Sequence, residues 1–402
     1  MSILITLFYI LCGIFGFFLL LPFLTTFFSL LFGKERVKAP AQEKQHDFGT
    51  IITAYKNCDI SKGLVESLLA QKYENQHIYL VADNCDISNW DIEHEKFTIF
   101  RPEPALNLKA KSIIHAMENY VRPHDYTVVF DADNVAHPDF YKVINKYANA
   151  GYSSIQGQRT AKNLDSVYAC ADATGEFYKN YTERYAPYLL GGSAVISGSG
   201  MAVETKLYKG YLDSPEIEQG KHLWKKMLQE DKILQNYLLR LNEKIAYAWD
   251  AIIYDEKVSD AEAVTTQRSR WLYSYFQNIP NSLGILRRGL FNFSFNQLYF
   301  GLVTIAPPLL VMMGVSGLLA FAALFINPWV TAAFAGAFFL FFGTIFWTLY
   351  LSKAEPVIWK NLQGLPMFLF RQLAALPKML NPNKNFKHTE HKKDVGVEEL
   401  VK

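Results

Sequence analysis

The sequence predicts an α/β domain built on a doubly wound, mixed and largely parallel sheet, with membrane-spanning helices before and after it. Three observations lead to this fold class. Short β-rich runs alternate with helical periods over residues 48–253, the apolar run 126–130 ends in Asp131 and Asp133, and charge-free segments lie near both ends of the 402-residue chain. Strands that alternate with helices are typical of parallel α/β sheets.

Composition narrows the class of protein. A hydrophobic content of 50% and an aromatic content of 15% exclude a disordered or fibrous chain. The formal net charge of +2 provides no polybasic character, so we expect no nucleic-acid partner. The four cysteines are widely spaced and form neither a disulfide framework nor a Cys-x-x-Cys metal motif, which favours a reducing compartment.

The N-terminal segment predicts a transmembrane helix over residues 1–33. Residues 2–32 carry no charge, and this stretch exceeds the roughly 20 residues that cross a bilayer. A cleaved signal peptide is the alternative, but it would have a shorter apolar core and a basic start. The linker 34–47 begins with Lys34, Arg36 and Lys38, and positive charge beside a span marks the cytoplasmic side. We therefore expect residues 48–271 to form a cytoplasmic domain.

Within that domain, the pattern predicts strands over 48–55, 78–83 and 97–100 and a strand ending at Asp131. Helices are expected over 60–71, 108–121 and 231–241, and a strand-like run over 193–203. The strand before Asp131 has no polar interruption, as expected of a strand buried on both faces at the centre of a parallel sheet.

The C-terminal third predicts more membrane contact. Residues 272–297 include Arg287 and Arg288 among apolar side chains and are typical of an amphipathic interface helix. Residues 298–352 predict a transmembrane hairpin that turns at Asn327-Pro328, with Pro307-Pro308 kinking its first span. The segment 353–380 is interfacial, re-entrant or spanning, and 381–402 is a polar cytoplasmic tail. These features indicate a multi-pass protein of the plasma or inner membrane.

Asp131 and Asp133 are the first candidate site residues. They follow a buried strand, and ligands of open α/β sheets bind outside the carboxyl ends of the strands. Two carboxylates there suit Mg²⁺ or Mn²⁺ bound to phosphates. The alternative is that the strand simply ends in an Asp/Asn turn.

Other polar residues are expected at the same sheet edge. Tyr55 ends the first strand, and Asp83, which ends the next, could accept from a uracil N3–H or a ribose hydroxyl; an Asx-turn is the alternative. Lys109 and Lys111 open a helix and could approach a diphosphate, although lysines on helices are often only solvated.

Three later stretches complete the candidate set. Ser199 and Gly200 lie in a small-residue run that would let a sugar approach the backbone, or that forms an ordinary bulge. The Glu230-Asp231 pair begins a helix, where an acid can also be merely a cap. The third stretch supplies Gln267, Arg268, Arg270 and Trp271. The two arginines could stabilise a departing diphosphate, and the Trp271 indole could face a pyranose ring. A basic, aromatic interfacial helix is the alternative there.

The order of these motifs resembles the family 2 membrane glycosyltransferases, which include cellulose, hyaluronan and chitin synthases with a D, D, D, Q-x-x-R-W pattern. The resemblance rests on Asp83, Asp131-Ala-Asp133, the Gly/Ser loop, Glu230-Asp231 and Gln267-Arg-Ser-Arg270-Trp271, and covers roughly residues 48–350. It implies a GT-A fold and inverting transfer from a nucleotide sugar, usually a UDP-sugar.

The resemblance also implies roles for the residues. Asp83 would contact uridine, and Asp133, helped by Asp131, would hold Mg²⁺ or Mn²⁺. Asp231, next to Glu230, would be the general base that takes the proton of the acceptor hydroxyl. Arg270, with Gln267 and Trp271, would meet the diphosphate and the acceptor.

Two departures from the family pattern bear on the product. Thr53-Ala-Tyr55-Lys56 replaces the Pro-Ala-Tyr-Asn of many relatives, and the spans are fewer than polymer-secreting synthases usually have. A homo-oligomer, a partner membrane subunit or a non-processive reaction would each explain the second departure. We expect β-linked extension of a polysaccharide or oligosaccharide first. The alternatives are transfer of one sugar to a polyprenyl phosphate or glycolipid-type acceptor, and a catalytically silent nucleotide-sugar-binding subunit.

Overall fold

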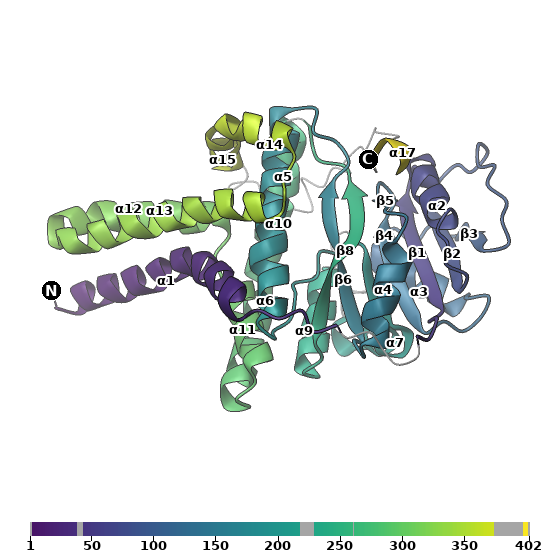
Figure 1. Ribbon diagram of the computed structural model, residues 1–402, viewed down its shortest axis with the longest axis horizontal. Helices are drawn as coiled ribbons and strands as arrows, with labels where there is room; N and C mark the ends of the chain where they lie inside the picture. The colour runs from purple at the N-terminus through teal and green to yellow at the C-terminus, as the bar shows by residue number, and fades with distance from the viewer. Residues whose placement is uncertain (1, 38–42, 218–228, 260, 374–396, 401–402) are drawn as a thin grey trace.

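The computed structural model describes residues 2–37, 43–217, 229–259, 261–373 and 397–400. An α/β domain forms one end of the molecule, and three long apolar helices project together from its other side (Figure 1). Helix α10 stands between these two parts, so the sheet and the apolar helices share a common wall (Figure 1).

The domain is built on an eight-stranded mixed sheet with the order β3-β2-β1-β4-β7-β6-β8-β5. Strands β3, β2, β1 and β4 are mutually parallel, β7 runs antiparallel to both β4 and β6, and β8 is parallel to β6. This arrangement confirms the predicted doubly wound mixed sheet. The strands are β1 (Phe48–Tyr55), β2 (Gln76–Asp83), β3 (Phe97–Phe100), β4 (Tyr126–Asp131), β5 (Val135–Ala136), β6 (Ser154–Ala161), β7 (Met201–Glu204) and β8 (Ile245–Asp255).

The register of the parallel strands brings the predicted polar ends together. Tyr55 pairs with Asp83 across β1 and β2, and Thr53 pairs with Asp131 across β1 and β4. The centre of β4 is fully buried at Val128, Val129 and Phe130, because helices cover both faces of a parallel sheet. Three strands therefore deliver their carboxyl ends to one edge.

Helices predicted from periodicity are found close to their expected positions. They correspond to η1 (Asp59–Ser61) with α2 (Lys62–Leu69), α3 (Lys109–Glu118) and α9 (Glu230–Arg240). The expected strand over 193–203 is paired only from Met201, because Gly198 and Gly200 adopt positive φ angles that leave the extended region. The domain also contains α4 (Phe140–Asn149), α5 (Val167–Lys179), the π-helix η2 (Asn180–Tyr185), α6 (Ala186–Leu189) and α7 (Thr205–Leu212).

Three helices of the described chain are long and apolar enough to cross a membrane: α1 (Ser2–Phe32), α12 (Leu309–Ile326) and α13 (Pro328–Leu351). They pack on one another through a small apolar cluster that includes Leu19, Phe334 and Phe341. The Asn327 side chain accepts from the Trp329 backbone N–H and caps α13, so the α12–α13 turn lies where the sequence placed it.

The C-terminal helices differ from the expectation at one point. Pro307-Pro308 was expected to kink a single span that starts near residue 298, but the helix stops there. Helix α11 (Phe295–Ile305) ends before the two prolines and packs on α10 (Ala261–Phe291). Helix α12 begins after them, at Leu309. Two adjacent prolines remove two backbone donors and disfavour the helical conformation of the preceding residue, which explains the break. Helix α10 also runs across the boundary that we placed at residue 271.

Residues 353–373 form short helices rather than a span. These are α14 (Pro356–Asn361), η3 (Leu362–Gly364) and α15 (Leu365–Leu373), which pack against α5 and α10. The remainder of the segment, 374–380, lies outside the described residues. So do 38–42 of the linker and the tail 381–402, apart from the short helix α17 (Val397–Leu400).

Candidate functional site

A single cavity of about 1770 Å³ lies at the carboxyl ends of β1, β2 and β4 and continues past α9 and α10 toward the apolar helices. Most of the predicted site residues line it, although they come from six separate elements. They are Tyr55, Asp83, Lys109, Asp131, Asp133, Glu230, Asp231, Gln267, Arg268, Arg270 and Trp271.

Asp83 fixes the loop that covers one end of the cavity. Its two carboxylate oxygens accept from the backbone N–H groups of Leu106 and Asn107, at 2.8 and 2.7 Å, and the side chain is almost completely buried. The Tyr55 hydroxyl donates to the Asn107 side chain at 2.9 Å. The ends of β1 and β2 thus hold the 105–107 loop in place. These bonds of Asp83 are long-range and do not form the alternative Asx-turn, in which the carboxylate would bond the backbone two residues further on.

Lys109 ties three elements together at the centre of the site. Its ammonium donates to Asp131 Oδ1 at 2.6 Å and to the Gly198 carbonyl at 3.0 Å, and lies 3.7 Å from Glu230 Oε1. Burial alone would lower the pKa of Lys109, but Asp131 and Glu230 outweigh it and raise that pKa above its ordinary value. A fixed cation therefore stands beside the end of β4.

Glu230 and Asp231 open helix α9 on the other side of Lys109. Burial raises the pKa of Glu230 to about 7; Lys109 opposes this shift, and Asp231 adds to it. Asp231 keeps 27% of its side chain exposed to the cavity, and one oxygen accepts from the Lys232 backbone N–H at 2.8 Å. The more accessible of the two carboxylates is thus Asp231.

Gly198 brings the small-residue loop close to that carboxylate. Its φ of +86° suits glycine, and a Cβ placed there would lie 3.7 Å from the Asp231 carboxylate. A side chain at this position would restrict access to Asp231. The glycine therefore keeps the space in front of the acid open.

Asp133 provides a second, largely buried carboxylate at the end of β4. The residue is 9% exposed and lines the cavity, and the neighbouring Asn134 Nδ2 lies 3.5 Å from its Oδ1. In the described chain, no group of three or more His, Cys, Asp or Glu side chains converges as a complete metal site. Two carboxylates at a cavity edge still fit Mg²⁺ or Mn²⁺, because Mg²⁺ commonly uses one or two carboxylates together with substrate phosphates.

Three predicted contacts are placed differently from expectation. Ser199 and Gly200 do not line the cavity: the buried Ser199 hydroxyl accepts from Asp131 N at 3.0 Å and bonds Asn134, while Gly200 packs against Ile253. Ser199 and Gly200 thus support the end of β4 from outside the cavity. Ser197 and Gly198 form this part of the cavity wall instead. Lys111 also lies outside the cavity lining, because it is two residues from Lys109 on helix α3 and cannot share its face.

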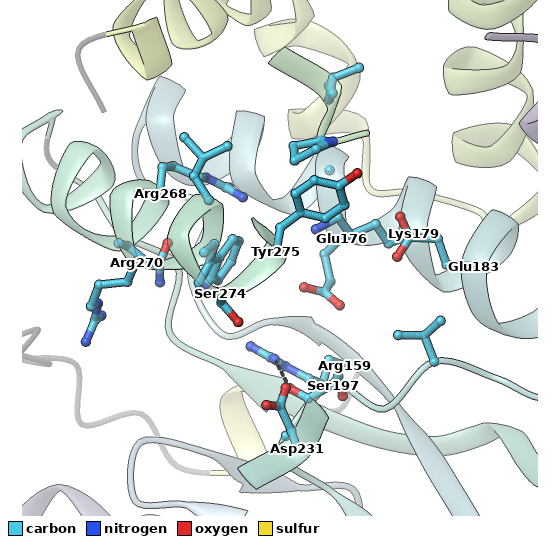
Figure 2. Close-up of a pocket in the computed structure, with 18 of the residues that line it drawn as sticks. Arg159, Glu176, Lys179, Glu183, Ser197, Asp231, Arg268, Arg270, Ser274 and Tyr275 are labelled. Carbon is cyan, nitrogen blue, oxygen red and sulfur yellow. Dashed lines mark hydrogen bonds between the residues drawn. The ribbon is translucent and has the colours of Figure 1, made fainter. Parts of the chain in front are cut away.

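Helix α10 forms the wall opposite the sheet. Arg268 pairs with Asp172 of α5, and its guanidinium lies over the Trp271 ring, 4.3 Å from the centroid. Arg268 and Arg270 leave α10 in different directions (Figure 2), so they do not act as one cation pair. Burial lowers the pKa of Arg270.

A buried network of charges, which the sequence did not reveal, forms the floor between β6, β8 and α5. Arg159 pairs with Asp255. Arg159 also donates to the Ser197 carbonyl at 2.9 Å (Figure 2). The other pairs are Lys257–Asp255 at 2.8 Å, Lys257–Glu176 at 3.6 Å and Arg184–Glu176 at 2.7 Å. The π-helix η2 follows α5 in the chain and contributes Arg184 to this network. Short π-helical segments often occur at functional sites. The sequence signal that could have revealed this network is the presence of charged residues within otherwise apolar segments.

Comparison with known proteins identifies similar folds. A family model described as "Glycosyltransferase like family 2" matches residues 46–274. No curated protein sequence matches the chain. Among solved structures, the mannosyltransferase PcManGT from Pyrobaculum calidifontis, in complex with GDP-Man and Mn²⁺, is similar with a TM-score of 0.58 and 12% identity over 92% of this chain and 99% of that chain.

Residues 1–349 of S. aureus TarS are also similar, but more distantly. Their structure gives a TM-score of 0.43 and 13% identity over 84% of this chain and 90% of that one. The complex of the same fragment with UDP gives 0.40 and 12%, over 60% and 65%. The PcManGT match agrees with a GT-A-like fold for this chain.

Proposed function

Since this chain belongs to the glycosyltransferase-like family 2, we propose that it moves a sugar from a nucleoside-diphosphate sugar to an acceptor at a membrane surface, with inversion at the anomeric carbon. The main support is that Asp131, Lys109, Glu230 and Asp231, from three elements, meet around one cavity at the carboxyl ends of the strands. Neighbouring apolar helices would hold that cavity beside the bilayer.

The proposed reaction needs one general base. An acceptor hydroxyl is too weak an acid to attack unaided, so Asp231 takes its proton as the oxygen bonds to the anomeric carbon. The sugar–diphosphate bond breaks on the opposite side, and the electron pair leaves with the diphosphate. Lys109 stabilises charge on the departing diphosphate, and Arg270 is assigned the same role from the motif order.

We propose that Asp133, with Asp131, holds Mg²⁺ or Mn²⁺. When bound, such an ion supplies Lewis-acid stabilisation of the leaving diphosphate. The structural neighbour PcManGT is described with GDP-Man and Mn²⁺, which supports the proposal of a divalent metal here. Lys109 already neutralises Asp131, so Asp133 is the better of the two ligands.

The donor and the acceptor are assigned on different grounds. The resemblance favours a UDP-sugar, whereas PcManGT is described with GDP-Man, so both nucleotides belong in the test. For the acceptor, the Gln-x-x-Arg-Trp motif alone predicts a growing polysaccharide or oligosaccharide with β-linkages. The apolar wall of the cavity between the candidate spans favours a lipid acceptor instead. Gln267 and Trp271, which line the cavity, are assigned to acceptor binding.

A silent nucleotide-sugar-binding subunit is the competing function. It would need neither an accessible base nor a metal ligand, yet Asp231 and Asp133 both line the cavity with Lys109. This combination favours the enzyme.

We also propose that the domain faces the cytoplasm of the plasma or inner membrane, and that a homo-oligomer or partner subunit would be needed if a polymer is exported.

Donor turnover tests the proposal. Purified full-length protein in lipid nanodiscs is incubated with a panel of UDP- and GDP-sugars, a mixture of lipid and oligosaccharide acceptors and either Mn²⁺ or Mg²⁺, and nucleoside diphosphate release is measured. We expect release with one donor, and its loss on chelation by EDTA. Binding of a nucleotide sugar without release from any donor would identify the silent subunit instead.

A further inference from the structure

The cavity does not end at the polar site but extends between the membrane helices. We define its "membrane arm" as the part lined by Phe18 and Leu21 of α1, Leu309 and Met313 of α12, and Phe342 and Ile345 of α13. These three helices are the candidate spans, and they pack against one another. The arm therefore connects the sheet edge with the hydrocarbon region of the bilayer.

The wall of the membrane arm offers little to a sugar chain. Two threonines that line the cavity, Thr25 of α1 and Thr304 of α11, already have hydrogen-bond partners. Thr25 Oγ1 donates to the Leu21 carbonyl at 2.7 Å and contacts the Tyr299 hydroxyl, and Thr304 Oγ1 donates to the Phe300 carbonyl at 2.9 Å. A carbohydrate there would bury several hydroxyls against Phe, Leu, Met and Ile side chains, which cannot hydrogen-bond them. A hydrocarbon chain would fit this wall.

The junction between the membrane arm and the polar site is cationic. Lys179, at the end of α5, lies 5.3 Å from the centroid of Trp271, whose other cationic neighbour is Arg268. Arg268 Nε is buried and has no hydrogen-bond partner in the part of the chain that the structure describes. Lys179 and Arg268 both line the cavity, so an anion at this point would face two cations.

Lys179 lines the cavity together with other charged side chains, which include Glu176, Glu183, Arg184 and Arg268. Burial lowers the pKa of Lys179; Glu183 opposes this shift and Arg268 adds to it. An anionic group beside Lys179 would offset the cost of its burial.

We propose that the acceptor is an anionic, hydroxyl-bearing phospholipid. Its acyl chains lie in the membrane arm, its phosphate lies between Lys179 and Arg268, and its headgroup hydroxyl extends toward Asp231. In Figure 2, Lys179, Glu176 and Glu183 lie on one side of the cavity and Asp231 lies across from them, with Arg159 and Ser197 drawn between. This inference rests on the proposed transferase function and names its acceptor class.

The reaction then balances with the residues already described. The headgroup oxygen bonds to the anomeric carbon and loses its proton to Asp231. The bond from that carbon to the diphosphate breaks, and the nucleoside diphosphate leaves with the electron pair. The product is a glycosylated phospholipid that keeps its own phosphate diester.

The acceptor class is tested with the full chain in nanodiscs, using the donor that supports nucleoside diphosphate release. The acceptors are phosphatidylglycerol, neutral diacylglycerol, polyprenyl monophosphate and a water-soluble oligosaccharide, and the label transferred to organic-extractable lipid is counted. We expect phosphatidylglycerol to be glycosylated at least tenfold faster than the others. Equal transfer to diacylglycerol, transfer to polyprenyl phosphate, or a water-soluble product would overturn the inference while the transferase function stands. Absence of release from any donor would instead contradict the function itself.

Two pairs of variants test the placement of the lipid. Lys179→Met should raise the KM for phosphatidylglycerol about tenfold, and Lys179→Arg should restore it to within threefold, because only the charge is needed. Gly314 lines the cavity on α12, and nothing lies within 4 Å of a Cβ there; Gly317 is as open but does not line the cavity. Gly314→Leu should raise the acceptor KM at least fivefold and Gly317→Leu should not. Equal effects of the two leucines, or an unchanged KM in Lys179→Met, would overturn the placement.

Discussion

At the residue scale, Asp133 is the most direct probe of the metal. Asp133→Ala should abolish the increase in nucleotide affinity that Mn²⁺ or Mg²⁺ produces, a loss of about tenfold or more, because the carboxylate is the proposed ligand of the ion. Calorimetric titration of the nucleotide with and without metal measures it. Asp139→Ala, at an exposed carboxylate before α4, is the matched control. Persistence of the metal effect in Asp133→Ala would place the ion elsewhere.

Glu230 gives a prediction about pH. Its pKa is raised by burial from its ordinary value near 4.5 to about 7 in the folded chain. The folded state therefore binds more protons than the unfolded state between these values, and stability falls as pH rises through that window and then levels off. Glu230→Gln cannot ionise, so it should lack this fall and be more stable than wild type by about 1–3 kcal/mol at pH 8.

Thermal unfolding in detergent from pH 4.5 to 8 measures the effect of Glu230→Gln. The difference in unfolding midpoint between variant and wild type should be small at pH 4.5 and should grow toward pH 7. Glu118→Gln, at an exposed position on α3, serves as the control and should show no such growth. A constant difference across the range would contradict the raised pKa.

The sequence correctly predicted the position of a site residue where the residue's place along a strand determines it. Asp83 and Asp131 end strands, so the parallel register alone brings them to one edge. The prediction failed where the direction of a side chain decides. Lys109 and Lys111 differ by two positions on a helix and so face about 200° apart, and the phase of the helix was not readable from the sequence. The Arg159–Asp255 pair was not predictable either, since it depends on the alignment of β6 with β8.

At the element scale, close helix packing depends on glycine. A Cβ on Gly301 of α11 would lie 2.6 Å from the Leu286 Cα of α10, so the helices would have to separate. We expect Gly301→Ala to destabilise the chain by about 1–3 kcal/mol. Gly284→Ala on α10 has open space at its Cβ and should instead stabilise it by about 0.5–1 kcal/mol. Denaturant or thermal unfolding compares the two, and a stabilising Gly301→Ala would refute the close crossing.

Elements were predictable in proportion to how strongly local chemistry specifies them. The strands β1 and β3 match their expected bounds, because both are short runs of β-formers bounded by polar or turn residues. The first C-terminal span was wrong in its start, since hydropathy runs continuously through Pro307-Pro308 and does not show that α11 turns to pack on α10. Tertiary packing decided that case.

At the scale of the whole molecule, the orientation in the membrane can be measured. Lys34, Arg36, Arg287, Arg288 and Lys353 flank the proposed spans, and positive charge favours the cytoplasmic side. All four natural cysteines are buried, so a maleimide should label an introduced, exposed cysteine much more strongly than the natural ones. In intact cells, a membrane-impermeant maleimide should label Trp329→Cys in the α12–α13 turn but not Ser88→Cys in the domain. Labelling of Ser88→Cys before lysis would place the domain outside.

The fold class could be predicted from alternating elements and charge-free ends, but the shape of the cavity could not. Its membrane arm arises because α1, which ends at Phe32, packs on α12 and α13, which begin only at Leu309 and Pro328. No periodicity in the chain specifies such a junction. The sequence therefore predicted Gln267 and Trp271 at the acceptor side of the cavity but not the membrane arm beyond them.

The most direct test of the central claim is the rate of sugar transfer by Asp231→Asn. The variant should bind the nucleotide sugar with wild-type affinity and lose transfer by about 10²–10⁴-fold, because the base is removed while the donor contacts are retained. Asp213→Asn, at an exposed carboxylate after α7, controls for charge loss. Transfer by Asp231→Asn within a few-fold of wild type, or a loss of nucleotide binding that matches the loss of transfer, would contradict the assignment of Asp231 as the general base.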